Sequence, residues 1–219
     1  MKKFIVLVCA MLATAALSAA EKTGYINMET VFNEYYKTIN ENITFENNRK
    51  AFVDGMDVLR TEYQASAKEF QKCKADAENE LLTTDARSAA ASRAKLLQGR
   101  LEQKQDEIME YRENGLREIE SKQQNVTNAL ADELATLVRK YAADNGYTLV
   151  FEVSGRTFSR VPAVLVYPKG SEITDAVIKV INAGHEKERT DGKAKLEALR
   201  KQAEEEAKAA AAAATAAAK

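Results

Sequence analysis

Residues 97–141 of the chain read LQGRLEQKQDEIMEYRENGLREIESKQQNVTNALADELATLVRKY. Within this stretch, apolar side chains recur every 11 residues, at Leu97, Ile108, Ile119, Leu130 and Tyr141. Eleven residues over three turns is ~3.67 residues per turn, so the spacing predicts a nearly straight α-helix with one narrow apolar stripe. The interval from 28 to 145 contains no proline, the strongest helix breaker, and is therefore predicted to be mostly helical.

This interval is predicted to fold back on itself, because a single rod of its length would extend ~175 Å. The segment Leu81-Leu82-Thr83-Thr84-Asp85 can supply a turn near residues 82–85, with Thr83 or Thr84 as the cap of the second helix. The first arm carries a stripe of apolar side chains with helical spacing, which is expected to face the second arm. Cys73 continues this stripe toward the turn, so its thiol is expected to be buried. The other members of that stripe are Met56, Leu59, Tyr63, Phe70 and Ala77.

The segments on either side of the hairpin have the character of a small β-containing body. Strands are expected at residues 23–26, 147–153 and 161–167, followed by a short helix that Thr174 caps and that ends at Gly184. The fold class is therefore α+β and mostly α, with a body at 21–27 and 146–184 and a helical hairpin at 28–145. Open sheet edges predict that this body oligomerises. The residues expected in its core and subunit contacts are Tyr25, Ile26, Leu149, Phe151, Val164 and Leu165.

Two glycines interrupt the arms at about the same level. With the turn near 83–84, Gly55 faces about position 112, within one helical turn of Gly115. Each glycine costs ~1 kcal/mol relative to alanine in a helix, so the pair could form a hinge at which the hairpin bends. A packing position that requires glycine is an equally good interpretation.

The two ends of the chain are predicted to lie outside this fold. Residues 1–20 have the pattern of a secretory signal peptide, with Lys2 and Lys3 before an apolar core and small residues before Glu21, where cleavage is expected. A membrane anchor is the alternative, but the uncharged run is shorter than the ~20 residues that a span requires. Residues 185–219 read as a charged, alanine-rich tail that is solvated and mobile at its end, with i,i+4 charge pairs that permit a fluctuating helix.

The composition argues against catalysis and against nucleic-acid binding. After removal of residues 1–20 the chain has 30 basic and 33 acidic side chains, so it lacks the basic character of a nucleic-acid-binding domain. It contains no glycine-rich phosphate loop, and its one histidine, His185, has no apparent catalytic partner. Cys73 and His185 cannot form a four-ligand zinc site without carboxylates. We therefore predict no catalytic, metal-binding or cofactor-binding residues.

One charge asymmetry lies beside the expected turn. Residues 86–101 contain four basic side chains and no acidic one: Arg87, Arg93, Lys95 and Arg100. Such a patch could attract anionic lipid or acidic partners, at ~1 kcal/mol for each residue near a charged membrane, which a vesicle-binding measurement would test. The alternative is an ordinary solvated helix face, since acidic residues lie close by in the sequence.

Four short stretches together resemble the Skp or OmpH family of periplasmic chaperones. The resemblance covers about residues 23–184 and is carried by Gly24-Tyr25-Ile26-Asn27, the segment 31–38, the segment 149–155 and the segment 173–178. It implies a periplasmic homotrimer whose strands join in a β-body and whose helical hairpins hold unfolded outer-membrane proteins without ATP or a cofactor. This chain differs from the family in its weakly charged arms and in the tail at 185–219.

Two other classes of function compete with a chaperone. A structural coiled-coil spacer or adaptor of the cell envelope would need the same long helices. An enzyme that uses the body as a scaffold is a remote third class, because the residues for it are missing.

Overall fold

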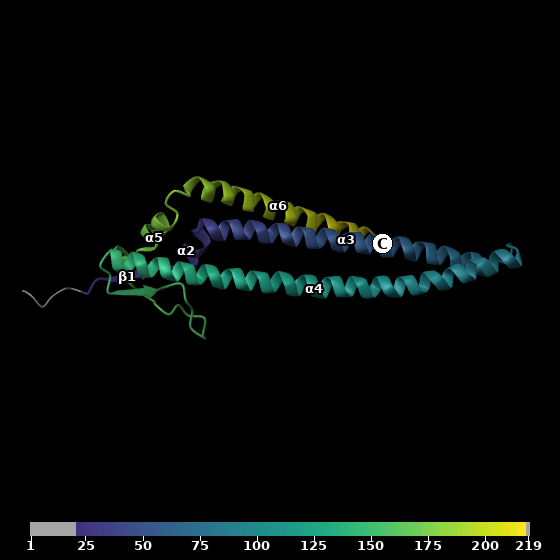
Figure 1. Ribbon diagram of the computed structural model, residues 1–219, viewed down its shortest axis with the longest axis horizontal. Helices are drawn as coiled ribbons and strands as arrows, with labels where there is room; N and C mark the ends of the chain where they lie inside the picture. The colour runs from purple at the N-terminus through teal and green to yellow at the C-terminus, as the bar shows by residue number, and fades with distance from the viewer. Residues whose placement is uncertain (1–20, 218–219) are drawn as a thin grey trace, which may run out of the picture. The chain divides into compact units, whose positions relative to one another are not determined.

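The computed structural model describes residues 21–217 (Figure 1). These residues divide into two compact units. The first unit comprises the chain up to Ile39 and Ala129–Thr190, and the second comprises Asn40–Asn128 and the chain from Asp191 onward. The predicted signal peptide at residues 1–20 and its cleavage before Glu21 lie outside the described residues. Over residues 21–217, no helix combines the length and the apolar character that crossing a membrane requires.

The first unit contains a parallel pair of short strands. Strand β1 (Thr23–Ile26) lies beside β2 (Leu149–Glu152), with Tyr25 opposite Phe151. Side chains alternate between the two faces of a strand, so Ile26 points into the core, where it is 2% exposed, while Tyr25 and Phe151 share the other face. A parallel pair needs a long connection, and the helices between residues 28 and 144 supply it.

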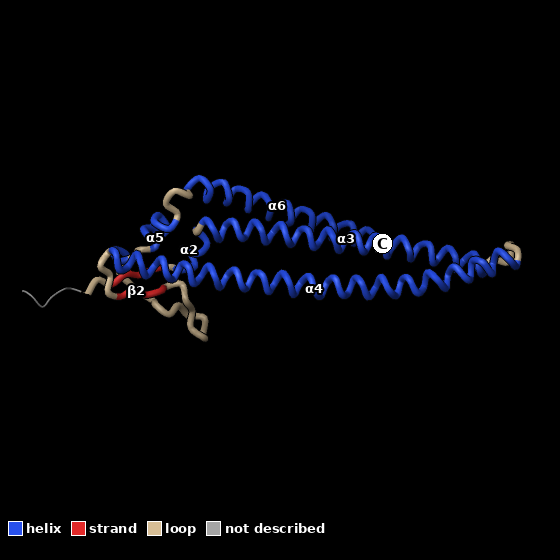
Figure 2. The backbone as a smooth tube through the Cα atoms, in the orientation of Figure 1, coloured by secondary structure: helices blue, strands red, loops and turns tan. Residues whose placement is uncertain are grey.

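The prediction of a third strand at residues 161–167 is wrong. In that stretch the structure has only an isolated bridge, between Arg156 and Pro162. The bridge lies within the loop that follows β2 (Figure 2). Pro162 and Pro168 have no N–H to donate to a ladder, and in residues 21–217 no backbone hydrogen bond joins residues 164–167 to another segment. Although its composition favours a strand, this stretch therefore has no partner strand within the described chain.

The helix predicted from residue 28 is interrupted once, at Tyr35. Helix α2 (Met28–Glu34) ends there, and α3 (Tyr36–Glu78) begins at the next residue. Tyr35 adopts an extended conformation, with φ −73° and ψ 127°, which removes it from the helical hydrogen-bond pattern. Its ring is buried, and its hydroxyl donates to Glu133 Oε1 at 3.0 Å. Burial, and to a smaller extent the Glu133 carboxylate, raise the pKa of Tyr35 to about 12.

The buried amide of Asn182 satisfies the backbone at this interruption. Its Oδ1 accepts a hydrogen bond from the Tyr36 N–H at 2.9 Å, and its Nδ2 donates to the Glu34 carbonyl at 3.1 Å and to the Ile178 carbonyl at 2.8 Å. Asn182 follows α5 (Thr174–Ile181) and is 2% exposed. One side chain thus connects α2, α3 and α5.

The expected cap of α5 has a different role. The N-cap position belongs to Ile173, which offers no side-chain hydrogen bond, so the prediction that Thr174 caps this helix is wrong. The Thr174 hydroxyl instead accepts from the Asn27 N–H at 3.0 Å and donates to Glu172 at 3.0 Å. Thr174 therefore joins the end of β1 to α5, close to the short 3-10 helix η1 (Lys169–Ser171).

In the second unit, α3 and α4 (Thr84–Asp144) run side by side in opposite directions (Figure 1). The turn occupies residues 79–83, and the Thr83 hydroxyl caps α4 by accepting from the Ala86 N–H at 3.3 Å. Met56, Cys73 and Leu97 of the predicted stripes are buried between the helices, which confirms the stripes and the buried thiol. Ion pairs Arg93–Glu69 and Lys104–Glu62 cross the pair.

The predicted solvated tail is a helix, α6 (Glu186–Ala217). In the second unit it contacts α3 through Lys50–Glu206 at 3.2 Å and Arg200–Glu46 at 3.5 Å. Leu196 of α6 is buried, with 8% of its surface exposed. Two ion pairs join the segment to α3, while most of its side chains stay exposed, as expected of a solvated tail. Mobility at its end stays a prediction.

Replacing Asn182 by alanine should destabilise the protein by about 1–3 kcal/mol, because the Tyr36 N–H and the Glu34 carbonyl would lose a partner in a buried site. Urea unfolding followed by circular dichroism measures the change. Asn145 offers a matched control, since its amide also donates to the carbonyl four residues earlier, but at the surface. Asn145→Ala should cost no more than about 0.5 kcal/mol. Equal losses for the two variants would contradict the role given to Asn182.

A second, half-buried anchor lies at the end of β2, where the Glu152 carboxylate accepts three backbone hydrogen bonds. The donors are the N–H groups of Met28 at 3.2 Å, Ser154 at 2.7 Å and Gly155 at 2.6 Å. Burial acts to raise the pKa of Glu152, but these hydrogen bonds and that of the Ser154 hydroxyl outweigh it and hold the pKa below its usual value. The ionised carboxylate therefore stabilises the junction of β2 with α2.

The Glu152 contribution should depend on pH. A carboxylate whose folded pKa lies below its unfolded value, ~4.3, stabilises the protein above that value, and the contribution is lost as pH falls through the folded pKa. Glu152→Gln should therefore cost about 1–2 kcal/mol at pH 7 and progressively less below pH ~4. Urea unfolding at several pH values measures the difference in unfolding free energy between the original chain and the variant, with the exposed Glu120→Gln as control. A difference that stays constant with pH would contradict the role given to the ionised Glu152 carboxylate.

Candidate functional site

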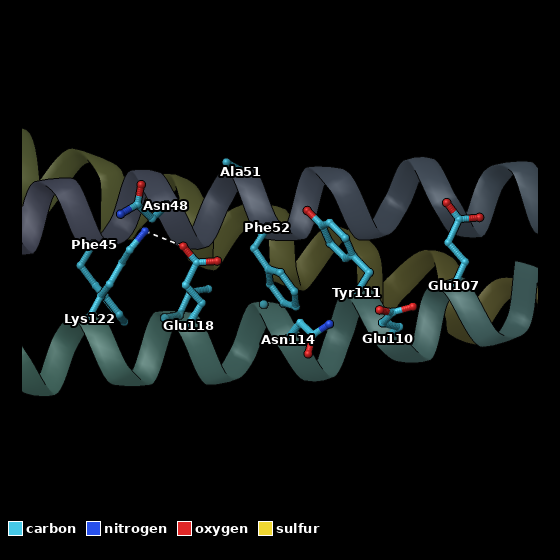
Figure 3. Close-up of a pocket in the computed structure, with 12 residues that line it drawn as sticks. Phe45, Asn48, Ala51, Phe52, Glu107, Glu110, Tyr111, Asn114, Glu118 and Lys122 are labelled. Atoms are coloured by element: carbon cyan, nitrogen blue, oxygen red, sulfur yellow. Dashed lines mark hydrogen bonds and ion pairs between the residues drawn. The ribbon is translucent and has the colours of Figure 1, made fainter.

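A groove runs along the α3–α4 pair near the middle of the second unit (Figure 3). It has a cavity volume of about 560 Å³, within the range of sites that hold small ligands or side chains. Its apolar lining comes from both helices and consists of Phe45, Ala51, Phe52, Tyr111, Gly115 and Ile119. Polar side chains form its edges, among them Glu107, Glu110 and the Glu118–Lys122 ion pair at 2.6 Å.

Two aromatic rings pack against two glycines in the middle of the groove. Phe52 and Tyr111 are stacked, with ring centroids 5.5 Å apart and an interplanar angle of 4°. A methyl group added to Gly55 would lie 2.2 Å from the Tyr111 hydroxyl, and one added to Gly115 would lie 2.4 Å from the Phe52 ring. Each helix therefore contributes one ring that covers the glycine of the other, an arrangement that we call the aromatic–glycine interlock.

The interlock gives Gly55 and Gly115 a packing role. Gly55 faces Tyr111, one residue from the position that the sequence predicted. The absence of a side chain is what lets the rings approach the opposite helix. The hinge at these two positions stays a prediction.

The family comparison agrees with this architecture. A family model described as "Outer membrane protein (OmpH-like)" matches residues 22–181, more than half of the chain. The chain belongs to the OmpH-like family. A comparison with curated proteins finds no match.

The OmpH-like match covers most of the first unit and the α3–α4 part of the second, but not the last helix. It ends at Ile181, whereas α6 begins at Glu186. The family is one of periplasmic chaperones, and its activity concerns outer-membrane proteins. Helix α6 and its contacts with α3 are therefore an addition to the part that this OmpH-like chain shares with its family.

The residues predicted for the body lie on different surfaces of the OmpH-like first unit. Ile26 is in the core, whereas Tyr25 stacks between Phe151, at 5.7 Å, and Tyr167, at 4.9 Å, on the outer face of the sheet. Leu149 is exposed on the same strand face, Val164 is half-buried, and Leu165 is 73% exposed in the loop. The structure thus brings Tyr25, Leu149 and Phe151 together and leaves Leu165 apart from the core.

The predicted basic patch, residues 86–101, lies in the first turns of α4. Arg87 is half-buried, and Arg93 pairs with Glu69 of the other helix, which offsets part of the positive charge. Lys95 and Arg100 are exposed. Attraction of anionic lipid by this patch stays a prediction.

Sequence reasoning missed the two rings of the interlock and the contacts of His185. The signal for the rings was present, because Phe52 precedes Gly55 by three residues and Tyr111 precedes Gly115 by four. His185 stacks on Tyr36, with ring centroids 3.8 Å apart, and its Nδ1 lies 2.8 Å from Glu188. It serves as a packing contact between α3 and the start of α6. Residues 21–217 contain no group of three histidine, cysteine or acidic side chains placed to hold a metal ion.

Alanine at Gly115 should destabilise the arms, although alanine is favoured over glycine within a helix by about 1 kcal/mol. The added methyl group must displace the Phe52 ring and break its stack with Tyr111. Gly99 is the matched control, since nothing lies within 4 Å of a methyl group there. We expect Gly99→Ala to stabilise by about 0.5–1 kcal/mol and Gly115→Ala to destabilise by about 0.5–2 kcal/mol in thermal unfolding. If both variants are equally stabilised, the interlock has no energetic role.

Proposed function

We propose that the chain is a holdase chaperone that binds unfolded outer-membrane proteins and prevents their aggregation in the periplasm without ATP. The observation that carries this proposal is the α3–α4 pair of an OmpH-like protein, which offers a long surface with a groove and scattered exposed apolar side chains. These side chains are Val53, Val58, Leu96, Met109 and Leu116. Many weak contacts along such a surface retain a disordered chain while allowing its release to a better-folded state.

We propose further that the first unit assembles into a homotrimer. A two-stranded sheet is marginal alone, and within residues 21–217 the outer edge of β2 has no partner strand. Apolar side chains are exposed on β2 and on the loop that follows it, which supports contacts with further copies. They are Leu149, Phe151, Phe158, Leu165 and Val166.

The proposed site of action is the periplasm, reached through removal of residues 1–20 before Glu21. The pattern of charged, apolar and small residues at the start of the chain supports export. The single cysteine of the remaining chain, Cys73, is buried and needs no partner in an oxidising compartment.

Purified chain 21–219 should keep a urea-unfolded outer-membrane barrel protein soluble on dilution, at close to one oligomer for each client. Light scattering follows aggregation, and sedimentation measures the stoichiometry. The same barrel protein folded beforehand in detergent is the control and should not bind, because its apolar segments are already paired. Aggregation at the rate seen in buffer alone would exclude the holdase and favour the structural spacer of the cell envelope.

A further inference from the structure

The groove of the α3–α4 pair combines aromatic ring faces with carboxylates that are not neutralised. Tyr111 is 37% exposed although its ring stacks on Phe52, so part of the stack is accessible to solvent. Glu107 and Glu110 line the same groove at the Tyr111 end (Figure 3). Within residues 21–217, neither carboxylate has an ion-pair or hydrogen-bond partner, whereas Glu118 at the other end pairs with Lys122.

The negative charge extends beyond the groove along α4. Between Glu102 and Glu120 the helix carries seven acidic and three basic side chains, in contrast to the segment 86–101, whose charged side chains are all basic. One of the three basic side chains, Lys104, is held by Glu62 of α3 at 2.5 Å. On its α4 side the groove therefore borders an excess of negative charge, which favours a ligand that carries positive charge.

An apolar floor beside free carboxylates matches the chemistry of arginine and lysine side chains. Their aliphatic stems cover apolar surface while the charged ends reach acidic groups. The arginine guanidinium also stacks on aromatic faces and forms bidentate contacts with carboxylates. An acidic segment would be repelled here, and a purely apolar one would leave Glu107 and Glu110 partly desolvated without compensation.

We propose that the α3–α4 groove binds extended client segments in which a basic side chain, arginine above all, adjoins an aromatic or aliphatic one. The apolar neighbour enters the groove beside Phe52 and Tyr111, and the basic side chain lies over the Tyr111 end against Glu107 and Glu110. This inference rests on the proposed holdase function and names the kind of client sequence that one part of the arms selects.

Fluorescence anisotropy with short labelled peptides tests the proposal on the full chain. One peptide alternates phenylalanine with arginine, a second alternates phenylalanine with glutamate, and a third replaces the phenylalanines of the first by serine. The first should bind more tightly than either of the others, because only it supplies both the apolar and the basic group. Its affinity should fall as salt is added, since the carboxylates are exposed to screening.

The variant Glu107→Gln/Glu110→Gln should weaken binding of the phenylalanine–arginine peptide by about three- to tenfold. The matched control is Glu113→Gln/Glu120→Gln, which removes the same charge from the same helix at exposed positions outside the groove. The control should change the affinity by less than about twofold. Equal losses in both variants, or equal binding of the arginine and glutamate peptides, would overturn the proposal.

The aggregation assay separates this inference from the holdase function. A chain that keeps the barrel protein soluble but shows no preference among the peptides would retain the function and lose the groove specificity. A chain that selects the arginine peptide but leaves aggregation unchanged would retain the groove and lose the holdase function.

Discussion

The amide of Asn182 is the interaction on which the first unit depends. A helix that stops and restarts inside a protein leaves an N–H and a carbonyl without partners, and in a buried site these groups are costly. Asn182 provides an acceptor for Tyr36 and a donor for Glu34 at once, while α5 holds its side chain through Ile178. The interruption at Tyr35 can therefore be buried, and α2 can pack on α5 beside the strand pair.

The two units are stabilised by different means, and the difference suits the holdase function that we propose. The first unit has a compact core in which Ile26, Val31 and Val177 are fully buried around polar anchors such as Asn182 and Glu152. The arms of the second unit bury only a narrow stripe, so their outer faces remain hydrated and accessible. Low local stability and accessible surface are what binding to varied, disordered partners requires. Within this thin interface, the aromatic–glycine interlock places one ring of each arm against the glycine of the other.

The sequence predicted the features that depend on nearby residues and missed those that depend on residues far apart in the chain. Helical stripes, the turn near Thr83 and the buried thiol of Cys73 were predictable because each depends on residues within a few turns of one another. The strand at 161–167 failed because a strand exists only when another edge is available to pair with it. The break at Tyr35 was missed because nothing between Glu34 and Tyr36 marks it, and its cause, Asn182, lies far along the chain.

The sequence by itself determined two long helices, their apolar stripes and the family to which the chain belongs, since periodicity and the absence of proline are local properties. Only the tertiary structure decided that β1 pairs in parallel with β2, that Asn182 closes the helix break, and that α6 contacts α3. It also decided that Phe52 and Tyr111 lie against the glycines of the opposite arm. These features depend on contacts between residues distant in sequence, whose energies no local pattern records.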